Sequence, residues 1–243
     1  MRKGRFLALT FLTAVMAALA LRSDCTAQEL RVFRSQMPYE DDLMRRQLYE
    51  HLTGIARGFL QQQDREIQAI QTPEDVAERR KTIRARIMDC IGPFPERSDL
   101  KARVTGSFER EGYRVENVVF QSRPGFYVTG NLYIPSSGDR PFPAVLGVNG
   151  HTLNGKAGLT YQRIWIGLAR KGYVVFTFDP PGQGERFMYW SEDLGASLVE
   201  GTTPEHTMAG IQCLLTGSNA ANYFIWDGIR AIDYLLTRPE VDP

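Results

Sequence analysis

Hydrophobic positions recur at helical spacing between residues 40 and 70, at intervals near three, four and seven. This spacing predicts an amphipathic helix. The positions are Leu43, Leu48, Leu52, Ile55, Phe59, Leu60, Ile67 and Ile70. His51 lies within this run and is interpreted as a surface residue of the helix.

A second helix is predicted from Thr72 to about Ile91, just before Gly92-Pro93. Thr72 can cap its first turn, Pro73 fits the first helical position, and Asp75 can complete a capping box. The helix carries a basic stripe, which we interpret as a solvated face. The stripe consists of Arg79, Arg80, Lys81, Arg84 and Arg86.

From residue 103 the pattern changes to β-rich runs separated by glycine and proline, which predicts strands at 104–109, 114–121 and 127–134. Two later runs, 144–148 and 173–178, are almost wholly apolar, as in strands covered on both faces. Helices are predicted at 161–171, ending at Gly172, and at 220–236, whereas 186–207 shows no regular pattern. The alternation of strand and helix predicts a parallel α/β unit that follows antiparallel strands.

The composition is that of a globular protein. The 243 residues are 43% hydrophobic and 23% charged, enough apolar material for a packed core and too much for intrinsic disorder. Lys and Arg total 29 against 28 Asp and Glu, a net charge of +1. This balance argues against a nucleic-acid partner held by a broad basic face.

The first residues have the organisation of a signal peptide. A basic start is followed by the uncharged run Phe6–Leu21 and by small residues at Cys25 and Ala27. The run has 16 residues, whereas a membrane-spanning helix needs about 20. We therefore expect cleavage after residue 27, with Gln28 as the new N-terminus, a secreted or periplasmic product and no stable membrane association. An uncleaved anchor is the alternative.

Cys90 and Cys213 would remain after cleavage. An exported compartment would allow them to pair. They lie far apart in the sequence and match no metal-ligand spacing, so two buried free thiols are the favoured interpretation. No metal site is predicted.

The first candidate site is the segment 147–156, directly after a predicted buried strand. Loops at the carboxyl ends of strands in open α/β sheets bind ligands. Glycines in this segment let the backbone turn sharply, and such a turn can aim backbone N–H groups at a developing oxyanion. An ordinary strand-to-helix loop is the alternative.

The second candidate segment is Asp179-Pro-Pro-Gly182-Gln-Gly184-Glu185-Arg186, after the other buried strand. Its glycines lack the third glycine of a dinucleotide fingerprint, and no Gly-Lys-Ser/Thr occurs. A nucleotide cofactor is therefore not expected, and no other cofactor is predicted.

No Gly-x-Ser-x-Gly occurs in these 243 residues; the nearest match, at 195–199, lacks the last glycine. Besides His51, the only histidines are His151 in the first candidate segment and His206 in the irregular region. His206 is interpreted as structural or exposed, because nothing near it in the sequence suggests a partner.

Several segments together resemble the N-terminal part of an α/β-hydrolase, and are most similar to secreted bacterial acetyl xylan esterase-like hydrolases. They are Pro-Ala-Val-Leu…Asn-Gly-His at 143–151, Gly-Tyr-Val-Val-Phe-Thr-Phe-Asp-Pro-Pro-Gly-Gln-Gly-Glu-Arg at 172–186, the run 227–242, and Tyr-Val-Thr-Gly-Asn-Leu-Tyr-Ile-Pro at 127–135. The resemblance covers roughly residues 70–243. It implies an incomplete α/β-hydrolase fold: a mixed, mostly parallel sheet flanked by helices, with an N-terminal helical lead-in.

The resemblance also implies the division of the chain and the roles of its loops. We expect a signal peptide at 1–27, a helical segment at 28–102, and at 103–243 the part of the hydrolase domain that precedes the nucleophile elbow. The serine, acid and histidine of the triad are expected beyond Pro243, so no catalytic residue is assigned within the chain. The oxyanion hole is carried over to Gly150, His151 and Thr152, with a backbone N–H of His151 or Thr152 as donor. Asp179, Gly182 and Gly184 are expected to hold the second loop in a structural role.

Two classes of function follow from these observations. In the first, the chain is the front part of an exported serine esterase acting on a small ester or an acetylated carbohydrate, although the same fold also hosts peptidases. In the second, it is a non-catalytic binding or interaction protein on half a hydrolase scaffold. The oligomeric state stays open, and the chain as it stands is expected to be inactive.

Overall fold

The structure is a computed structural model that describes residues 42–243. The predicted signal peptide and its cleavage site lie outside these residues. The chain divides into two compact units, 1–76 and 77–243. This division does not test the predicted domain boundary at 102/103, which remains a prediction. In the part of the chain that the structure describes, no helix is both long and apolar enough to cross a membrane.

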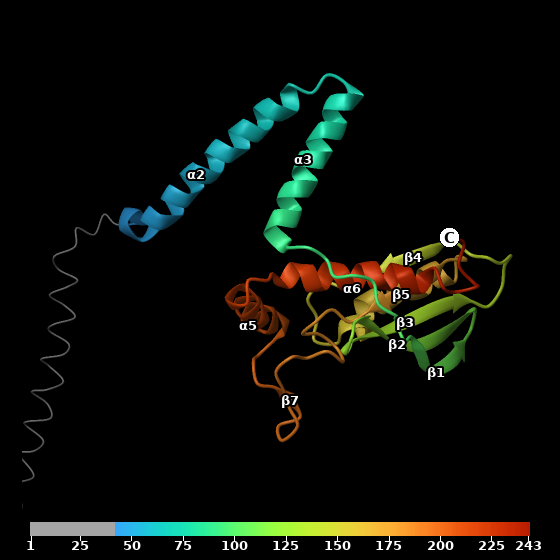
Figure 1. Cartoon of the computed structure of the whole chain (residues 1–243). Coiled ribbons are helices and arrows are strands. Elements are labelled where there is room, and N and C mark those ends of the chain that lie inside the picture. Colours follow the sequence, from blue (N-terminus) through green and yellow to red (C-terminus); the bar gives the residue numbers. More distant parts are fainter. Residues whose placement is uncertain (1–41) are drawn as a thin grey trace, which may run out of the picture. The chain divides into compact units, whose positions relative to one another are not determined.

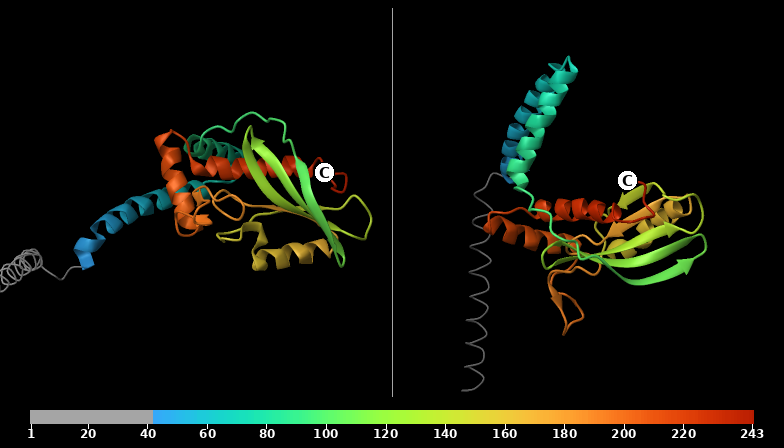
Figure 2. Two further views of the ribbon diagram at one scale, coloured as in Figure 1. Left: turned by 90° about the horizontal axis from the view of Figure 1, so that it is seen from below. Right: turned by 45° about the vertical axis from the view of Figure 1, so that its right-hand side comes forward.

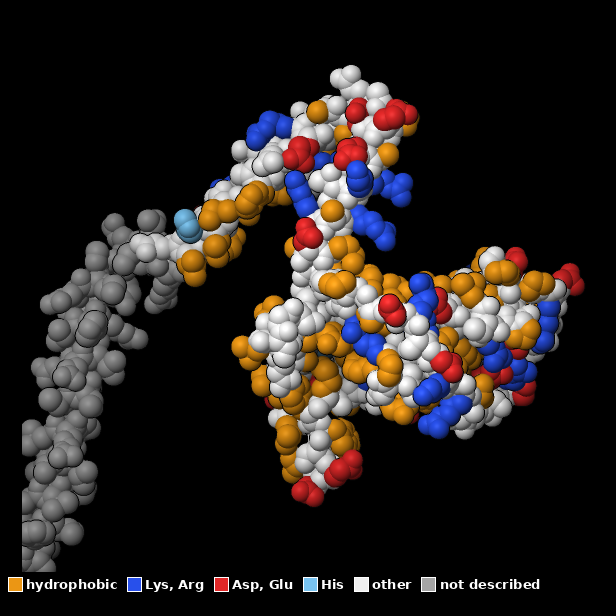
Figure 3. Space-filling model, viewed as in Figure 1, with side chains coloured by type: hydrophobic (Ala, Val, Ile, Leu, Met, Phe, Trp, Pro, Cys, Tyr) orange, Lys and Arg blue, Asp and Glu red, His pale blue; other side chains and the backbone are white. Residues whose placement is uncertain are grey.

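The first predicted helix is confirmed as α2, Asp42–Gln68 (Figure 1). Hydrophobic side chains gather along one side of α2 and are exposed there (Figure 3). They include Leu48, Leu52, Ile55 and Phe59. His51 is exposed on the same helix, as predicted.

The second predicted helix is confirmed as α3, Pro73–Ile91, and its first turn contains the predicted capping box. The Asp75 N–H donates to Thr72 Oγ1 at 3.1 Å, and the Thr72 N–H donates to Asp75 Oδ2 at 3.0 Å. The Asp75 carboxyl also accepts a hydrogen bond from the Gln71 N–H at 3.1 Å. This bond has the largest effect in holding the pKa of the exposed Asp75 carboxyl below its usual range, and Thr72 has the next. The basic stripe of α3 is largely exposed, as expected.

Three strands form an antiparallel meander: β1 (Arg103–Arg110), β2 (Tyr113–Arg123) and β3 (Phe126–Pro135). Two-residue turns at 111–112 and 124–125 join them. Such turns can connect only antiparallel neighbours. The three predicted strands are therefore confirmed, each slightly longer than the sequence pattern indicated.

The sheet continues with β5 (Val174–Phe178) and ends at β4 (Ala144–Gly147), in the order β1-β2-β3-β5-β4. β3 pairs antiparallel with β5, and β5 pairs parallel with β4, with Leu146 opposite Phe176. The mixed sheet is confirmed. The expectation that it is mostly parallel is corrected for the described strands, since only the β4–β5 pair is parallel.

The two central runs differ in burial. Every residue of β5 is buried, as predicted, but Tyr173, which was expected to begin this strand, precedes it and is exposed. In β4 only Gly147 is fully buried, and Val148 lies beyond the strand with 65% of its surface exposed. Both faces of β4 do carry packing, since Ala144 and Leu146 contact the core on the α6 side and Val145 contacts the core on the α4 side. These three residues are only half-buried, because β4 is at the edge of the sheet and pairs with β5 alone.

Helices cover both faces of the sheet, with α4 (Leu159–Ala169) on one side and α6 (Ala220–Leu235) on the other (Figure 2). The core on the α6 side contains Phe120, Leu132, Phe176 and Tyr234. The core on the α4 side contains Tyr113, Val115, Trp165 and Val175. α4 is followed by Gly172 with φ 91°, in the left-handed conformation that favours glycine at the end of a helix.

The region 186–207 was predicted to be irregular, and this prediction is wrong in part. It contains a short hairpin of β6 (Trp190–Ser191) and β7 (Ala196–Ser197) and the beginning of α5 (Thr202–Leu215). The hairpin is fixed by Glu205, which is fully buried and accepts hydrogen bonds from the Met188 N–H at 2.8 Å and from the Ser197 hydroxyl. A buried carboxylate therefore stabilises this segment, and no apolar stripe in the sequence signals it.

Cys90 and Cys213, the two cysteines of the described residues, are free thiols. Cys213 is half-buried, but Cys90 is exposed, so the expectation that both are buried is wrong for Cys90. Cys90 lies at the end of α3, where its carbonyl accepts a hydrogen bond from Asn219 Nδ2 at 3.3 Å.

Candidate functional site

The loops that follow β4 and β5 meet at one edge of the sheet, because the two strands are parallel. The Gly184 N–H donates to the carbonyl of Leu153 at 3.1 Å. The Thr152 N–H donates to Oε1 of the buried Gln183 at 2.6 Å. The two candidate segments of the sequence therefore form one site, joined by hydrogen bonds in both directions.

The three residues assigned to the oxyanion hole differ in what their N–H groups do. The Gly150 N–H donates to the hydroxyl of Tyr161 at 2.8 Å, and the Thr152 N–H is taken by Gln183. Among the described residues, the His151 N–H has no hydrogen-bond partner. Of the two predicted oxyanion donors, the N–H groups of His151 and Thr152, only that of His151 is thus unoccupied.

The backbone at residue 150 lies so close to the hydroxyl of Tyr161 that only glycine fits there. A Cβ at this position would lie 2.6 Å from Tyr161 Oη, nearer than real Cβ atoms come to other groups. A side chain here would have to displace the hydroxyl that binds the Gly150 N–H. The path of the loop therefore depends on the missing Cβ.

Asp179 follows β5 directly and has no exposed surface. Its carboxylate accepts hydrogen bonds from Thr129 Oγ1 at 2.9 Å, from the Lys156 N–H at 2.7 Å and from the Glu185 N–H at 3.2 Å. Lys156 Nζ lies 2.5 Å from Asp179 Oδ2 and 2.5 Å from Glu185 Oε2. The carboxylate thus joins β3, the loop after β4 and the loop after β5.

Gly155 and Gly184 have positive φ and lie against this carboxylate. A Cβ on Gly155 would lie 2.0 Å from Asp179 Oδ1, and a Cβ on Gly184 would lie 2.3 Å from the same atom. Gly184 is among the residues predicted to hold this loop, whereas no role was predicted for Lys156. A buried lysine is rare unless it is paired, and nothing in the sequence around Lys156 indicated its partner.

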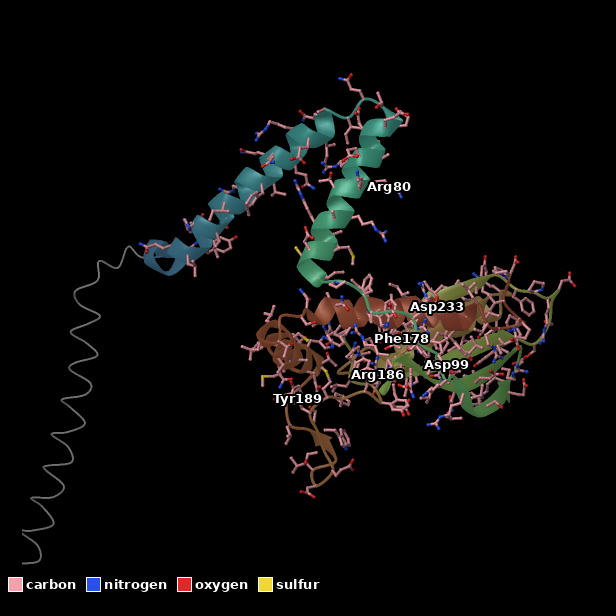
Figure 4. The ribbon with its side chains drawn as sticks, viewed as in Figure 1. Arg80, Asp99, Phe178, Arg186, Tyr189 and Asp233 are labelled. Atoms are coloured by element: carbon pink, nitrogen blue, oxygen red, sulfur yellow. The ribbon has the colours of Figure 1, made fainter. Side chains whose placement is uncertain are left out.

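Arg186 connects this loop to α6. Its Nη1 donates to the carbonyl of Asp179 at 2.7 Å and to Asp227 Oδ2 at 2.8 Å, and both side chains are buried. Figure 4 labels Arg186 together with Phe178, the last residue of β5. The loop after β5 is therefore held from two directions, by Lys156 and by α6.

His206, which the sequence analysis interprets as structural or exposed, is half-buried and has two partners. Its Nδ1 lies 3.0 Å from Nε2 of His151, and its Nε2 lies 2.7 Å from the carbonyl oxygen of Pro181. The ring is half-buried in the first turns of α5. No sequence signal could have paired two histidines that lie so far apart along the chain.

A hollow of about 560 Å³ lies between the sheet and the two loops. Its lining combines side-chain amides, a charged pair and aromatic rings, including Asn117, Asn131, Lys156, Glu185, Phe187 and Trp190. Asn131 Nδ2 donates to Asn117 Oδ1 at 2.6 Å, and Trp190 is 46% exposed. Among residues 42–243, no group of three or more His, Cys, Asp or Glu side chains is placed to hold a metal ion.

The mixed sheet, with a helix on each face and loops gathered at the carboxyl ends of its parallel strands, has the fold of part of an α/β-hydrolase. Solved esterases of that superfamily are its structural neighbours. No family model matches the sequence. No curated protein matches it either.

Three of these neighbours are described as acetyl xylan esterases. That from Bacteroides fragilis has a TM-score of 0.60 and 19% identity, over 71% of this chain and 46% of its own. That from a Thermoanaerobacterium species has a TM-score of 0.44 and 16% identity, over 60% and 43%. That from a Paenibacillus species has a TM-score of 0.43 and 19% identity, over 65% and 53%. This chain thus spans about half the length of these structures. The likeness to the Bacteroides fragilis structure establishes the fold.

Proposed function

We propose that this chain is the front part of an exported serine esterase that acts on small esters or acetylated carbohydrates. One observation carries the proposal: the loop after β4 is tied down on both sides of His151 and leaves the His151 N–H unoccupied. Gly150 is held by Tyr161, and Thr152 is held by Gln183. A fixed, unused backbone donor at the carboxyl end of a parallel strand is what an oxyanion hole requires.

The reaction would be acyl transfer to water. A serine would attack the ester carbonyl and form an acyl-enzyme as the acyl C–O bond breaks and the alcohol leaves, and water would then cleave the acyl-enzyme, releasing the acid and the free serine. The His151 N–H would stabilise the oxyanion of each tetrahedral intermediate, together with the N–H of the residue after the nucleophile. Because the 243 residues contain no Gly-x-Ser-x-Gly, the proposal assigns them one oxyanion donor, with the nucleophile, acid and base supplied from outside them.

The neighbouring hollow supports a carbohydrate as the alcohol or acyl-bearing part of the substrate. Hydrogen bonding within the Asn131–Asn117 pair leaves the Nδ2 group of Asn117 and the Oδ1 atom of Asn131 available to hydroxyl groups. The exposed face of Trp190 can pack against the apolar face of a sugar ring. Names of the solved neighbours point to the same class of substrate.

The proposal separates into two experiments. The chain of 243 residues should hydrolyse p-nitrophenyl acetate no faster than buffer. Turnover that survives repurification and is lost on changing one residue of this chain would contradict the assignment. Reading the gene past codon 243 should give an open frame with Gly-x-Ser-x-Gly within about a dozen codons. A stop codon there would favour the non-catalytic binding protein.

In an enzyme made from that frame, Gly150→Val should lower turnover by roughly 10²-fold or more, the scale of losing one oxyanion donor. His151→Ala should cost much less, because the proposed donor is the backbone N–H and alanine keeps it. These two variants form a matched pair at adjacent positions. A folded Gly150→Val enzyme with unchanged turnover would show that this loop is not the oxyanion hole.

Export is part of the proposal. The basic start, the apolar run and the small residues at Cys25 and Ala27 support cleavage by signal peptidase. Mass spectrometry of the protein recovered from the periplasm or medium of a Gram-negative host should find Gln28 at its N-terminus. A product that keeps Met1 would contradict it.

A further inference from the structure

Two histidine rings from distant parts of the chain meet beside the loop after β4. His151 belongs to that loop, and His206 belongs to the first turns of α5. The distance is 3.0 Å from His151 Nε2 to His206 Nδ1, and 2.7 Å from His206 Nε2 to the carbonyl oxygen of Pro181. Both are hydrogen-bond distances, so the three groups form a chain.

The direction of this chain follows from one group that can only accept. The carbonyl of Pro181 has no proton, so Nε2 of His206 must carry the hydrogen of that bond. In a neutral ring, Nδ1 of His206 is then a bare acceptor. His151 must donate to it and therefore carries its hydrogen on Nε2, which leaves Nδ1 of His151 bare.

The surroundings hold His206 in this position. Its ring packs edge-on against Phe224 of α6, with ring centroids 5.0 Å apart. Gly182 makes room for it, because a Cβ there would lie 3.1 Å from His206 Cδ2. The preceding residue, Glu205, is fully buried and fixes the start of α5 to the hairpin. The ring of His206 is therefore anchored, whereas His151 is exposed.

We propose that His206 is a positioning residue: its Nδ1 fixes the ring of His151 as the Nε2–H tautomer and so fixes the loop that carries the His151 N–H. The tautomer assignment stands on the geometry of the three groups alone. Only the purpose of the fixation, to hold an oxyanion donor in place, rests on the proposed function.

The charges around His206 agree with an unprotonated Nδ1. Burial has the largest effect on its pKa and lowers it, and His151 lowers it further. The Pro181 carbonyl and the Glu205 carboxylate act in the opposite direction, and the pKa remains below its usual value. If Nδ1 of His206 took up a proton, it could no longer accept a hydrogen bond. The Nε2–H of His151 would then lose its acceptor.

The test is nitrogen NMR of the histidine rings in the full chain at neutral pH. The chain has three histidines, and the exposed His51 on α2 provides an internal reference. The ratio of Nε2–H to Nδ1–H tautomer at His151 should exceed that at His51 by roughly fivefold, the ratio that one net hydrogen bond supports. A scalar coupling between His151 Nε2 and His206 Nδ1 should be visible across the hydrogen bond.

Two variants separate the two nitrogens of His206. In His206→Asn the amide occupies the place of Nδ1 and can still accept from His151, whereas in His206→Gln it occupies the place of Nε2 and can only reach Pro181. The tautomer ratio of His151 should persist in His206→Asn and return to that of His51 in His206→Gln. The amide protons of the 150–152 loop should exchange faster in His206→Gln alone.

Any other pattern overturns the proposal: equal tautomer ratios at His151 and His51 in the parent chain, both variants releasing the ring, or neither doing so. A variant that fails to fold is identified by its lost amide dispersion, and the parent-chain measurement then decides. Since no step of this test measures ester hydrolysis, failure of the proposed function would leave its result unchanged.

Discussion

Replacing Asp179 with alanine should strongly destabilise the unit 77–243. The carboxylate is fully buried and receives hydrogen bonds from Thr129, Lys156 and Glu185 as well as the ammonium group of Lys156. The substitution removes the carboxylate that accepts all of these hydrogen bonds. It leaves Lys156, whose side chain is only 9% exposed, with a single carboxylate partner at the surface.

The magnitude follows from the burial of the two partners. Removing one member of a buried ion pair costs about 3–5 kcal/mol, because the other charge stays in a poorly solvated place. We expect the lower end, about 3 kcal/mol, because Glu185 still contacts Lys156 and its side chain is 66% exposed to water. That loss is a large fraction of the roughly 5–15 kcal/mol by which folded domains are stable.

The measurement is urea unfolding of the full chain, followed by the fluorescence of the buried Trp165 and Trp226. Asp193→Ala is the matched control, because Asp193 is exposed on the β6–β7 hairpin and the described residues include no recorded partner for it. That control should change the free energy of unfolding by at most about 0.5 kcal/mol. A loss below about 1 kcal/mol for Asp179→Ala, at unchanged slope, would refute the structural role given to this carboxylate.

Three further predictions concern other contacts. Gly184→Ala should destabilise the chain, because the new Cβ would lie 2.3 Å from Asp179 Oδ1, and the cost should shrink in an Asp179→Ala background; purely additive costs would contradict this. Thr72→Ala should raise the pKa of Asp75 toward 3.8, measured by carboxyl NMR titration, with an unchanged pKa as the contrary result. Because that pKa is lowered in the folded chain, the cap stabilises α3 above the unfolded-state pKa and loses its effect as the pH falls through the folded value. His206 has a folded pKa below 6.5, so the unfolded chain binds its proton more readily and stability should fall as the pH drops below 6.5. Urea unfolding at neutral and acidic pH should show a smaller decrease in His206→Gln, and an equal decrease would contradict the assignment.

The sequence by itself determined the elements whose signals are local. The run Val174–Phe178 is almost wholly apolar, and each of its residues is buried in β5. Thr72 and Asp75 gave the start of α3, and Gly172 marked the end of α4, because caps depend on a few neighbouring residues. The position of the candidate site was also predictable, since glycine-rich segments directly follow two short apolar runs of the sequence, 144–148 and 173–178.

Only the tertiary structure decided which groups meet at that site. At the start of α5 the buried side chain is the carboxylate of Glu205 and not a row of apolar residues. The pattern of apolar positions therefore could not predict the hydrogen bonds that Glu205 accepts. Lys156 contacts Asp179, which lies 23 positions further along the chain, and His151 contacts His206, which lies 55 positions further. Such pairs depend on where the sheet brings the two loops together. The same holds for the choice between the N–H groups of His151 and Thr152, because Gln183 occupies one of them from the neighbouring loop.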